Sequence, residues 1–148
     1  MSIKINKNGK GYPLGFMPQH YPADRVYLDG DISKTVQDAL NYSTDEHVVG
    51  EWIDGSILYE KTVDCGALPN ATSKNIAHNI SNLKRIVFMC GYAYRSNGGN
   101  FMPLPFAHEG VATGNVSLAC NSTNIIITDG SDRSAFAESY VTIRYTKA

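Results

Sequence analysis

The fold of this chain is decided by the stretch from Val48 to Thr62, which reads VVGEWIDGSILYEKT. Asp54-Gly55 is a favoured pair for a two-residue type I′ turn, because both central positions of that turn need a positive φ. With the turn at this pair, Trp52 lies opposite Ile57 on the partner strand. The stretch therefore predicts an antiparallel β-hairpin.

Side chains alternate along each strand of the predicted hairpin, so one face collects its apolar residues. These residues are Val48, Trp52, Ile57 and Tyr59. Because this face holds the only tryptophan of the chain, we expect it to be buried. Trp52, Asp54, Gly55 and Tyr59 are accordingly predicted to be scaffold residues of the hairpin rather than a binding site.

Length and charge limit the classes of function. The chain has 148 residues, which fits one domain with an appendage. Charged residues make up 18% and the net charge is −1, with Lys and Arg scattered among acids. We therefore expect no nucleic-acid partner and no membrane partner. The N-terminus lacks the apolar stretch of a signal peptide, and no apolar run is long enough to cross a bilayer.

The cysteines indicate free thiols. Cys65, Cys90 and Cys120 are odd in number and lack the close spacing of metal sites. Each falls in a predicted strand, so we expect buried thiols that behave as small apolar residues. A chain that folds in a reducing cytosol fits this pattern.

The N-terminal part divides into an arm and a helix. Residues 1–31 are interrupted by glycines and prolines yet rich in apolar side chains, so we predict an extended anchoring arm that orders against another surface. Residues 32–46 are predicted to form a short helix and a linker. The apolar stripe of that helix consists of Ile32, Val36, Ala39 and Leu40. The stripe needs a partner, which is either the same helix of other chains or the chain's own β-domain.

Residues 47–148 are predicted to form an antiparallel, jelly-roll-like β-sandwich. Short strand patterns recur there with turn signals between them, and no helical crossover is available. The strongest strand runs from Arg85 to Arg95 and has two apolar faces. One face is predicted to carry Ile86, Phe88, Cys90, Tyr92 and Tyr94. The prolines of residues 101–106 restrict that segment to a sheet edge or a loop.

The sequence carries no arrangement of residues typical of catalysis. The four histidines are isolated, and His108-Glu109 lacks the second histidine of a zinc motif. Asp129-Gly130-Ser131-Asp132 resembles a calcium loop only faintly, because the terminal bidentate glutamate is missing. We expect no metal, no cofactor and no enzymatic activity.

Aromatic residues give the stronger functional indication. Tyr92, Tyr94 and Phe101 flank a turn that carries asparagines, and Phe106 follows in the proline-rich segment. Exposed rings beside amide groups would suit stacking on sugars, whereas the simpler interpretation places the rings in the core and at subunit interfaces. The candidate host-contact residues are Asn97, Asn100, Phe101 and Phe106.

The hairpin stretch also resembles a known group of proteins. From His47 to Thr62 the chain is similar to a segment, roughly VVGxWIDGKPLYxKT, of bacteriophage and prophage tail-fibre and virion-appendage proteins. Residues 67–70 and 78–83 continue the likeness as ALPN and HNISNL, where the family reads ALPN and HGISNL. Residues 23–28 and 35–40 resemble the linker helix before such domains. Asn79 departs from the family glycine, and Ser56 takes the place of a Lys-Pro pair.

The resemblance implies a virion structural protein, either a short tail fibre or a head fibre or decoration protein. It implies a homo-oligomer, most simply a homotrimer, assembled in the bacterial cytoplasm and held to other virion proteins through residues 1–31. The outward end would contact a glycan or protein of the host surface as a receptor-binding region. The alternative is a stand-alone carbohydrate-binding β-sandwich module, and a third class is a depolymerase that uses acids such as Asp129 or Asp132.

Overall fold

The computed structural model describes residues 6–7, 10–11 and 42–148. The chain divides into two units, Met1–Asn41 and Tyr42–Ala148. In the first unit, strands β1 (Asn6–Lys7) and β2 (Lys10–Gly11) form an antiparallel pair. Most of the predicted arm, and the helix residues Ile32, Val36, Ala39 and Leu40, lie outside the described residues.

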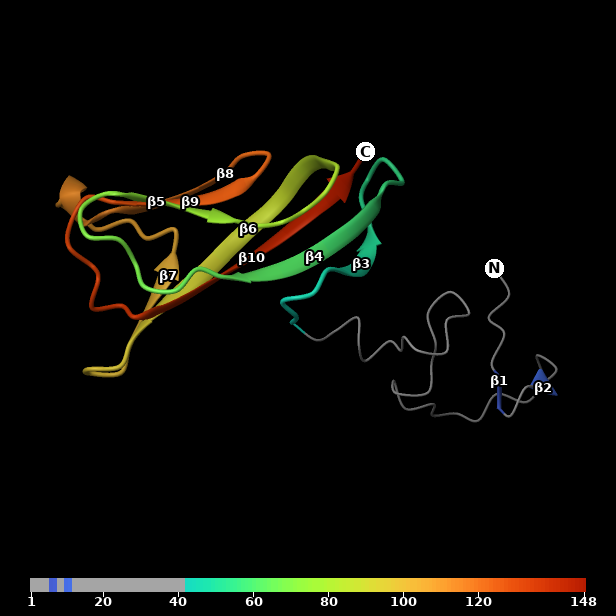
Figure 1. The fold of residues 1–148 in the computed structure, drawn as a ribbon, viewed down its shortest axis with the longest axis horizontal. Helices are drawn as coiled ribbons and strands as arrows, with labels where there is room; N and C mark the ends of the chain where they lie inside the picture. Colours follow the sequence, from blue (N-terminus) through green and yellow to red (C-terminus); the bar gives the residue numbers. More distant parts are fainter. Residues whose placement is uncertain (1–5, 8–9, 12–41) are drawn as a thin grey trace. The chain divides into compact units, whose positions relative to one another are not determined.

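The second unit consists of two antiparallel sheets (Figure 1). The larger sheet has the strand order β3-β4-β10-β6-β7 and the smaller sheet has the order β5-β9-β8. The larger sheet comprises β3 (His47–Glu51), β4 (Ile57–Asp64), β6 (Leu83–Arg95), β7 (Asn100–Leu104) and β10 (Glu138–Lys147). The smaller sheet comprises β5 (Ser73–Ala77), β8 (Val116–Cys120) and β9 (Asn124–Asp129), with a 3-10 turn at Ala112–Gly114.

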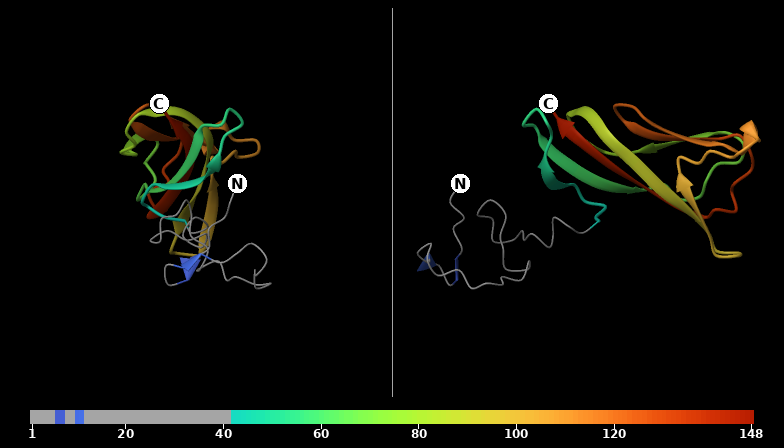
Figure 2. Two further views of the ribbon diagram at one scale, coloured as in Figure 1. Left: turned by 90° about the vertical axis from the view of Figure 1, so that its right-hand side faces the viewer. Right: turned by 180° about the vertical axis from the view of Figure 1, so that it is seen from behind.

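The core lies between the two sheets. β10 occupies the middle of the larger sheet and contributes Val141, Ile143 and Tyr145, which are fully buried. β9 is the middle strand of the smaller sheet and contributes Ile125 and Ile127, also fully buried. The predicted all-β sandwich is confirmed. The tip of the β6–β7 hairpin projects away from the smaller sheet (Figure 2).

Two β-bulges change which side chains share a face of β6. Arg144 pairs with Phe88, but the next residue, Tyr145, pairs with Ile86, so Val87 is an extra residue in the ladder. Ile86 therefore packs against the core, whereas Phe88 lies on the outer face. The prediction that both share one face was wrong, because strict alternation cannot anticipate a bulge.

The Asp-Gly hairpin exists, but its turn differs from the predicted one. The Gly55 amide donates to Trp52 O at 2.9 Å and the Trp52 amide donates to Ser56 O at 2.8 Å, which closes a three-residue loop. Within the loop of residues 53–55, Gly55 alone has a positive φ, 79°. Asp54 Oδ1 accepts a hydrogen bond from the Ser56 amide at 3.0 Å. This matches a type I turn with a bulge at glycine rather than type I′.

The altered loop shifts the hairpin register by one residue. Glu51, not Trp52, lies opposite Ile57, and a further bulge follows between Val48 and Gly50. The predicted burial of the tryptophan face was wrong in part, since Val48 is 44% exposed and Ile57 50% exposed. Trp52 itself is half-buried. β3 and the hairpin tip are the edge of the sheet, where the smaller sheet does not cover them.

The cysteines are free, as predicted, but only one is buried. Cys65 follows β4 and belongs to the core, and burial raises the pKa of its thiol to about 11. Cys120 is half-buried, and Cys90 is exposed on the outer face of β6. The thiol of Cys65 is therefore held protonated at neutral pH.

Candidate binding face

The outer face of the larger sheet carries rows of side chains that the strand register sets side by side. Phe101, Tyr94 and Glu138 form one row across β7, β6 and β10. The next row along the strands consists of Pro103, Tyr92, Tyr140 and Asp64. Because directly opposed residues in a ladder share a face, these side chains gather at one end of the sheet.

Four of these residues form a continuous aromatic cluster, which we call the aromatic face: Tyr92, Tyr94, Phe101 and Tyr140. The ring centroids of Tyr92 and Tyr140 are 5.8 Å apart, those of Tyr92 and Phe101 are 6.0 Å apart, and those of Tyr94 and Phe101 are 4.7 Å apart. The rings are tilted by 32° to 55° against their neighbours. Phe101 is 70% exposed and Tyr92 38% exposed, so ring surface remains open to solvent.

The polar groups beside the aromatic face are acidic. The Tyr92 hydroxyl donates to Glu138 Oε1 at 3.1 Å, which fixes the orientation of that ring. Partial burial, the hydrogen bond to Glu138 and the nearby charges of Glu138 and Asp64 raise the pKa of Tyr92. The Tyr92 hydroxyl therefore stays neutral, and the charge of this region is negative.

A charged row lies farther along the same face. The Arg144 Nε donates to Glu60 Oε2 at 2.6 Å, and His47 Nε2 lies 3.7 Å from Glu60 Oε1. Arg144 also lies over the ring of Phe88, 5.6 Å from its centroid. The Arg144 guanidinium is thus engaged by Glu60 and Phe88, away from the aromatic cluster.

The outer face of the smaller sheet has a different character. Its exposed positions on the edge strands β5 and β8 are small or polar: Ser73, Asn75, Ala77, Ser117 and Ala119. Small and polar side chains of this kind are typical of a surface exposed to water. The cluster of exposed aromatic rings lies instead on the larger sheet.

The candidate host-contact residues do not form one site. Asn97 lies in the turn between β6 and β7 and is exposed. Asn100 begins β7 and is also exposed, but alternation along the strand places it on the face opposite Phe101. Phe106 faces the other way, because alternation from the buried Met102 and Leu104 turns it toward the core. Its ring packs beneath Arg133, at 5.5 Å.

The aromatic face also includes residues that the sequence did not single out. Tyr140 and Glu138 come from β10, whose pairing with β6 joins segments far apart in the chain. The alternation of Tyr140 with Val141 and Thr142 indicated a strand, but no local pattern reveals which strand it pairs with. The sequence alone did not give the pairing register of β10 with β6, which places Tyr140 and Glu138 on this face.

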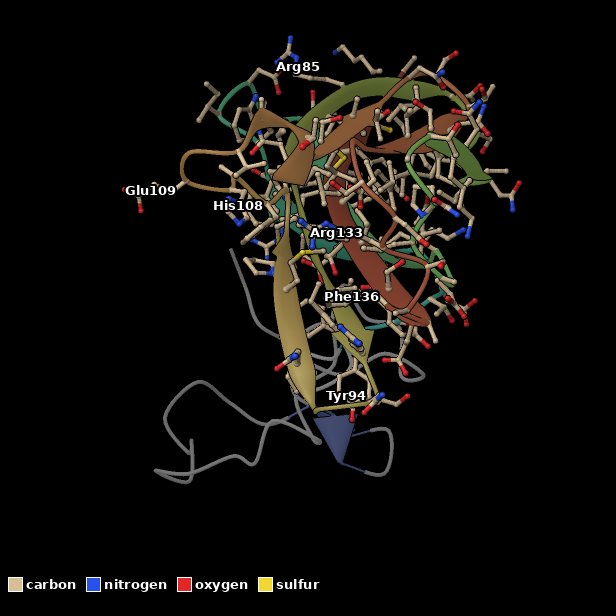
Figure 3. The ribbon with its side chains drawn as sticks, turned by 90° about the vertical axis from the view of Figure 1, so that its left-hand side faces the viewer. Arg85, Tyr94, His108, Glu109, Arg133 and Phe136 are labelled. Carbon is tan, nitrogen blue, oxygen red and sulfur yellow. The ribbon has the colours of Figure 1, made fainter. Side chains whose placement is uncertain are left out.

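The acidic loop that faintly resembled a calcium site joins two segments of the chain through Asp129 and Arg133, and we call this set of contacts the clasp. Asp129 is buried, and its Oδ2 lies 3.3 Å from Arg133 Nε as an ion pair without hydrogen-bond alignment. The Arg133 guanidinium also donates to Gly114 O at 2.6 Å. In Figure 3, Arg133 and Phe136 lie between β7 and β10, whereas Glu109 projects away from the body.

Asp132 belongs to a surface turn in which Ser134 donates to its Oδ1. Within residues 42–148, no group of three or more His, Cys, Asp or Glu side chains is arranged to hold a metal ion. His78 is a buried structural residue whose Nδ1 accepts from the Ile80 amide at 3.1 Å. No helix in the described part of the chain is long and apolar enough to cross a membrane.

No protein-family model, no curated protein and no solved structure matches this chain. Within the described residues, the functional interpretation therefore starts from the chemistry of the aromatic face.

Proposed function

We propose that this chain is a bacteriophage virion structural protein, a short fibre or appendage of the tail or head. The observation that carries the proposal is the resemblance of residues 47–62 to the hairpin segment of tail-fibre and virion-appendage proteins. In this proposal, residues 1–31 hold the protein to other virion proteins, and the helix predicted within residues 32–46 joins its copies into a trimer. The sandwich projects outward, and the protein has no catalytic role.

A backbone feature supports the resemblance. Asn79 stands where the resembled segment has glycine, and its φ is 54°. This left-handed conformation is the one that glycine adopts without strain and that asparagine tolerates best among other residues. The departure from the family pattern thus keeps the backbone conformation for which a glycine would be chosen.

The oligomeric state tests the proposal. The full-length protein should have the mass of a trimer by light scattering at micromolar concentration without any ligand. Val36→Asp should reduce that mass to the monomer, because three buried carboxylates would meet at the helix interface. Asn41→Asp, on the opposite side of the predicted helix, is the matched control and should leave the mass unchanged. A monomeric wild-type protein would overturn the proposal.

The aromatic face favours the second candidate, a stand-alone carbohydrate-binding module. Such a module binds as a monomer, so the same light-scattering measurement separates the two candidates. A depolymerase has less support, since Asp129 is buried against Arg133 and Asp132 is held in a surface turn. Asp132→Asn together with a polysaccharide-cleavage assay tests that third class.

A further inference from the structure

We infer that the aromatic face of β6, β7 and β10 binds a neutral oligosaccharide. The role of this binding in host contact depends on the proposed function. The binding of sugar depends only on the chemistry of this face, and it is expected equally of a monomeric module. It places the contact on the sheet rather than in the loops at the far end of the sandwich.

The first argument is the rigidity of the rings. Tyr92 and Tyr94 lie on β6, which pairs on both sides with β10 and β7. The Tyr92 hydroxyl is fixed by Glu138, and Phe101 is braced by both tyrosines. A ligand that stacks on these rings orders few side chains on binding, which lowers the entropic cost.

The second argument is the mixture of ring faces with hydrogen-bonding groups. A sugar presents a face of C–H groups that stacks on an aromatic ring, and a rim of hydroxyls that must find polar partners. The exposed ring of Phe101 and the partly exposed ring of Tyr92 supply the stacking surface. Glu138 and the tyrosine hydroxyls lie around them.

The third argument is charge, which selects the ligand class. Glu138 and Asp64 lie beside the rings. Among the paired residues that share this face, the nearest cation is Arg144, which already contacts Glu60 and Phe88. An acidic sugar would meet uncompensated carboxylates. A second copy that docked through the same face would add its own Glu138 and Asp64 to that interface, and the face offers no free cation in its strand rows to neutralise them. A hydroxyl-rich neutral ligand instead gives the carboxylates donors.

Calorimetry on the full-length protein tests the inference with four defined probes: cellohexaose, maltohexaose, N-acetyl-chitohexaose and, as the acidic probe, hexagalacturonate. At least one neutral hexasaccharide should bind saturably, and hexagalacturonate should not. Phe101→Ala should weaken the neutral binding by about tenfold, since one stacked ring contributes about 1.4 kcal/mol. Phe101→Tyr keeps a ring and should restore affinity.

Phe88→Ala is the matched control, because Phe88 is exposed on the same sheet face but lies in the charged row. It should leave affinity unchanged. The inference is overturned if none of the neutral probes binds, if hexagalacturonate binds as tightly, or if Phe101→Ala has no effect. A fall in oligomer mass with Phe101→Ala would also overturn it, because the face would then cover another copy. A monomer that binds sugar would overturn only the proposed fibre.

Discussion

Gly91 lies where β6 runs directly against the backbone of β10, opposite Val141. A Cβ at this position would lie 2.2 Å from Tyr140 O, which is backbone and cannot rotate away. Gly91→Ala should therefore push the two strands apart and lower the free energy of unfolding by about 3 kcal/mol. Urea unfolding measures this change.

Gly99→Ala is the control for that substitution. Gly99 has a φ of 64° in the β6–β7 turn, and no atom lies within 4 Å of its ideal Cβ. Only backbone strain is added, at a cost of about 1 kcal/mol. Equal destabilisation by the two substitutions would contradict the steric explanation for Gly91.

Glu46 ties the segment before β3 to the last strand. Its carboxylate accepts from the Tyr145 hydroxyl and from Lys147 Nζ, at 2.5 Å for the lysine. Partial burial raises the pKa of Glu46, but the hydrogen bonds from Lys147 and Tyr145 together outweigh it, and the net pKa lies below 4.5. The folded state thus favours the ionised carboxylate.

The sign of the pH effect follows from this lowered pKa. The contribution of Glu46 is present above its unfolded pKa and is lost as the pH falls through the folded value. Glu46→Gln should lower stability at pH 7 and should flatten the stability profile below about pH 4.5. Glu51→Gln, an exposed substitution on β3, should follow the wild-type profile. Unfolding curves between pH 7 and pH 2.5 decide, and parallel wild-type and Glu46→Gln profiles would refute the assignment.

At the scale of elements, the contacts of Arg133 with Asp129, Gly114 and Phe106 join two loops of the sandwich. Arg133 joins the segment after β9 to Gly114 and to the ring of Phe106, and it neutralises the buried Asp129. Arg133→Met keeps much of the side-chain bulk but leaves that carboxylate without a cation. We expect a loss of about 3 kcal/mol in unfolding free energy.

A second variant separates charge from packing at the clasp. Asp129→Asn combined with Arg133→Met should recover part of the loss, since no buried charge remains unpaired. Arg85→Met is the surface control, because Arg85 is half exposed at 3.5 Å from Asp54, and it should cost less than about 1 kcal/mol. A double variant no more stable than Arg133→Met would show that packing, not charge, carries the clasp.

The sequence predicted most strands of the sandwich and fewer of their pairings. Alternation and turn residues located the strand at 85–95 and the pair around residues 121–123, because both signals are local. The loop geometry at Asp54-Gly55 depended on whether Asp54 takes a positive φ, which the dipeptide alone does not decide. That single difference shifted the hairpin register.

At the scale of the whole molecule, the candidate binding face depended on long-range pairing. Tyr92 and Tyr140 meet because β10 inserts between β4 and β6, although β4 and β6 are nearer to each other in sequence. The aromatic residues themselves were visible in the sequence, whereas their division between core and surface was not. Phe101 and Phe106 show this, because alternation of side chains along β7 and the residues after it places Phe101 on the outer face and Phe106 against the core.

The division of the chain at residue 41 leads to the last prediction. The buried core that the structure describes lies within Tyr42–Ala148. This unit begins before the predicted start at His47, because Glu46 and Ser43 are hydrogen-bonded to the sandwich. Residues 42–148 alone should therefore fold, with a urea midpoint close to that of the sandwich in the full chain.

Under the proposed function, this fragment should be a monomer while the full chain is a trimer. Circular dichroism and light scattering measure the two properties, and neutral-sugar affinity should persist in the fragment, since the aromatic face lies wholly within it. A fragment that stays trimeric would move the subunit interface from the N-terminal segment onto the sandwich, and a fragment that cannot fold would show that the core needs residues 1–41.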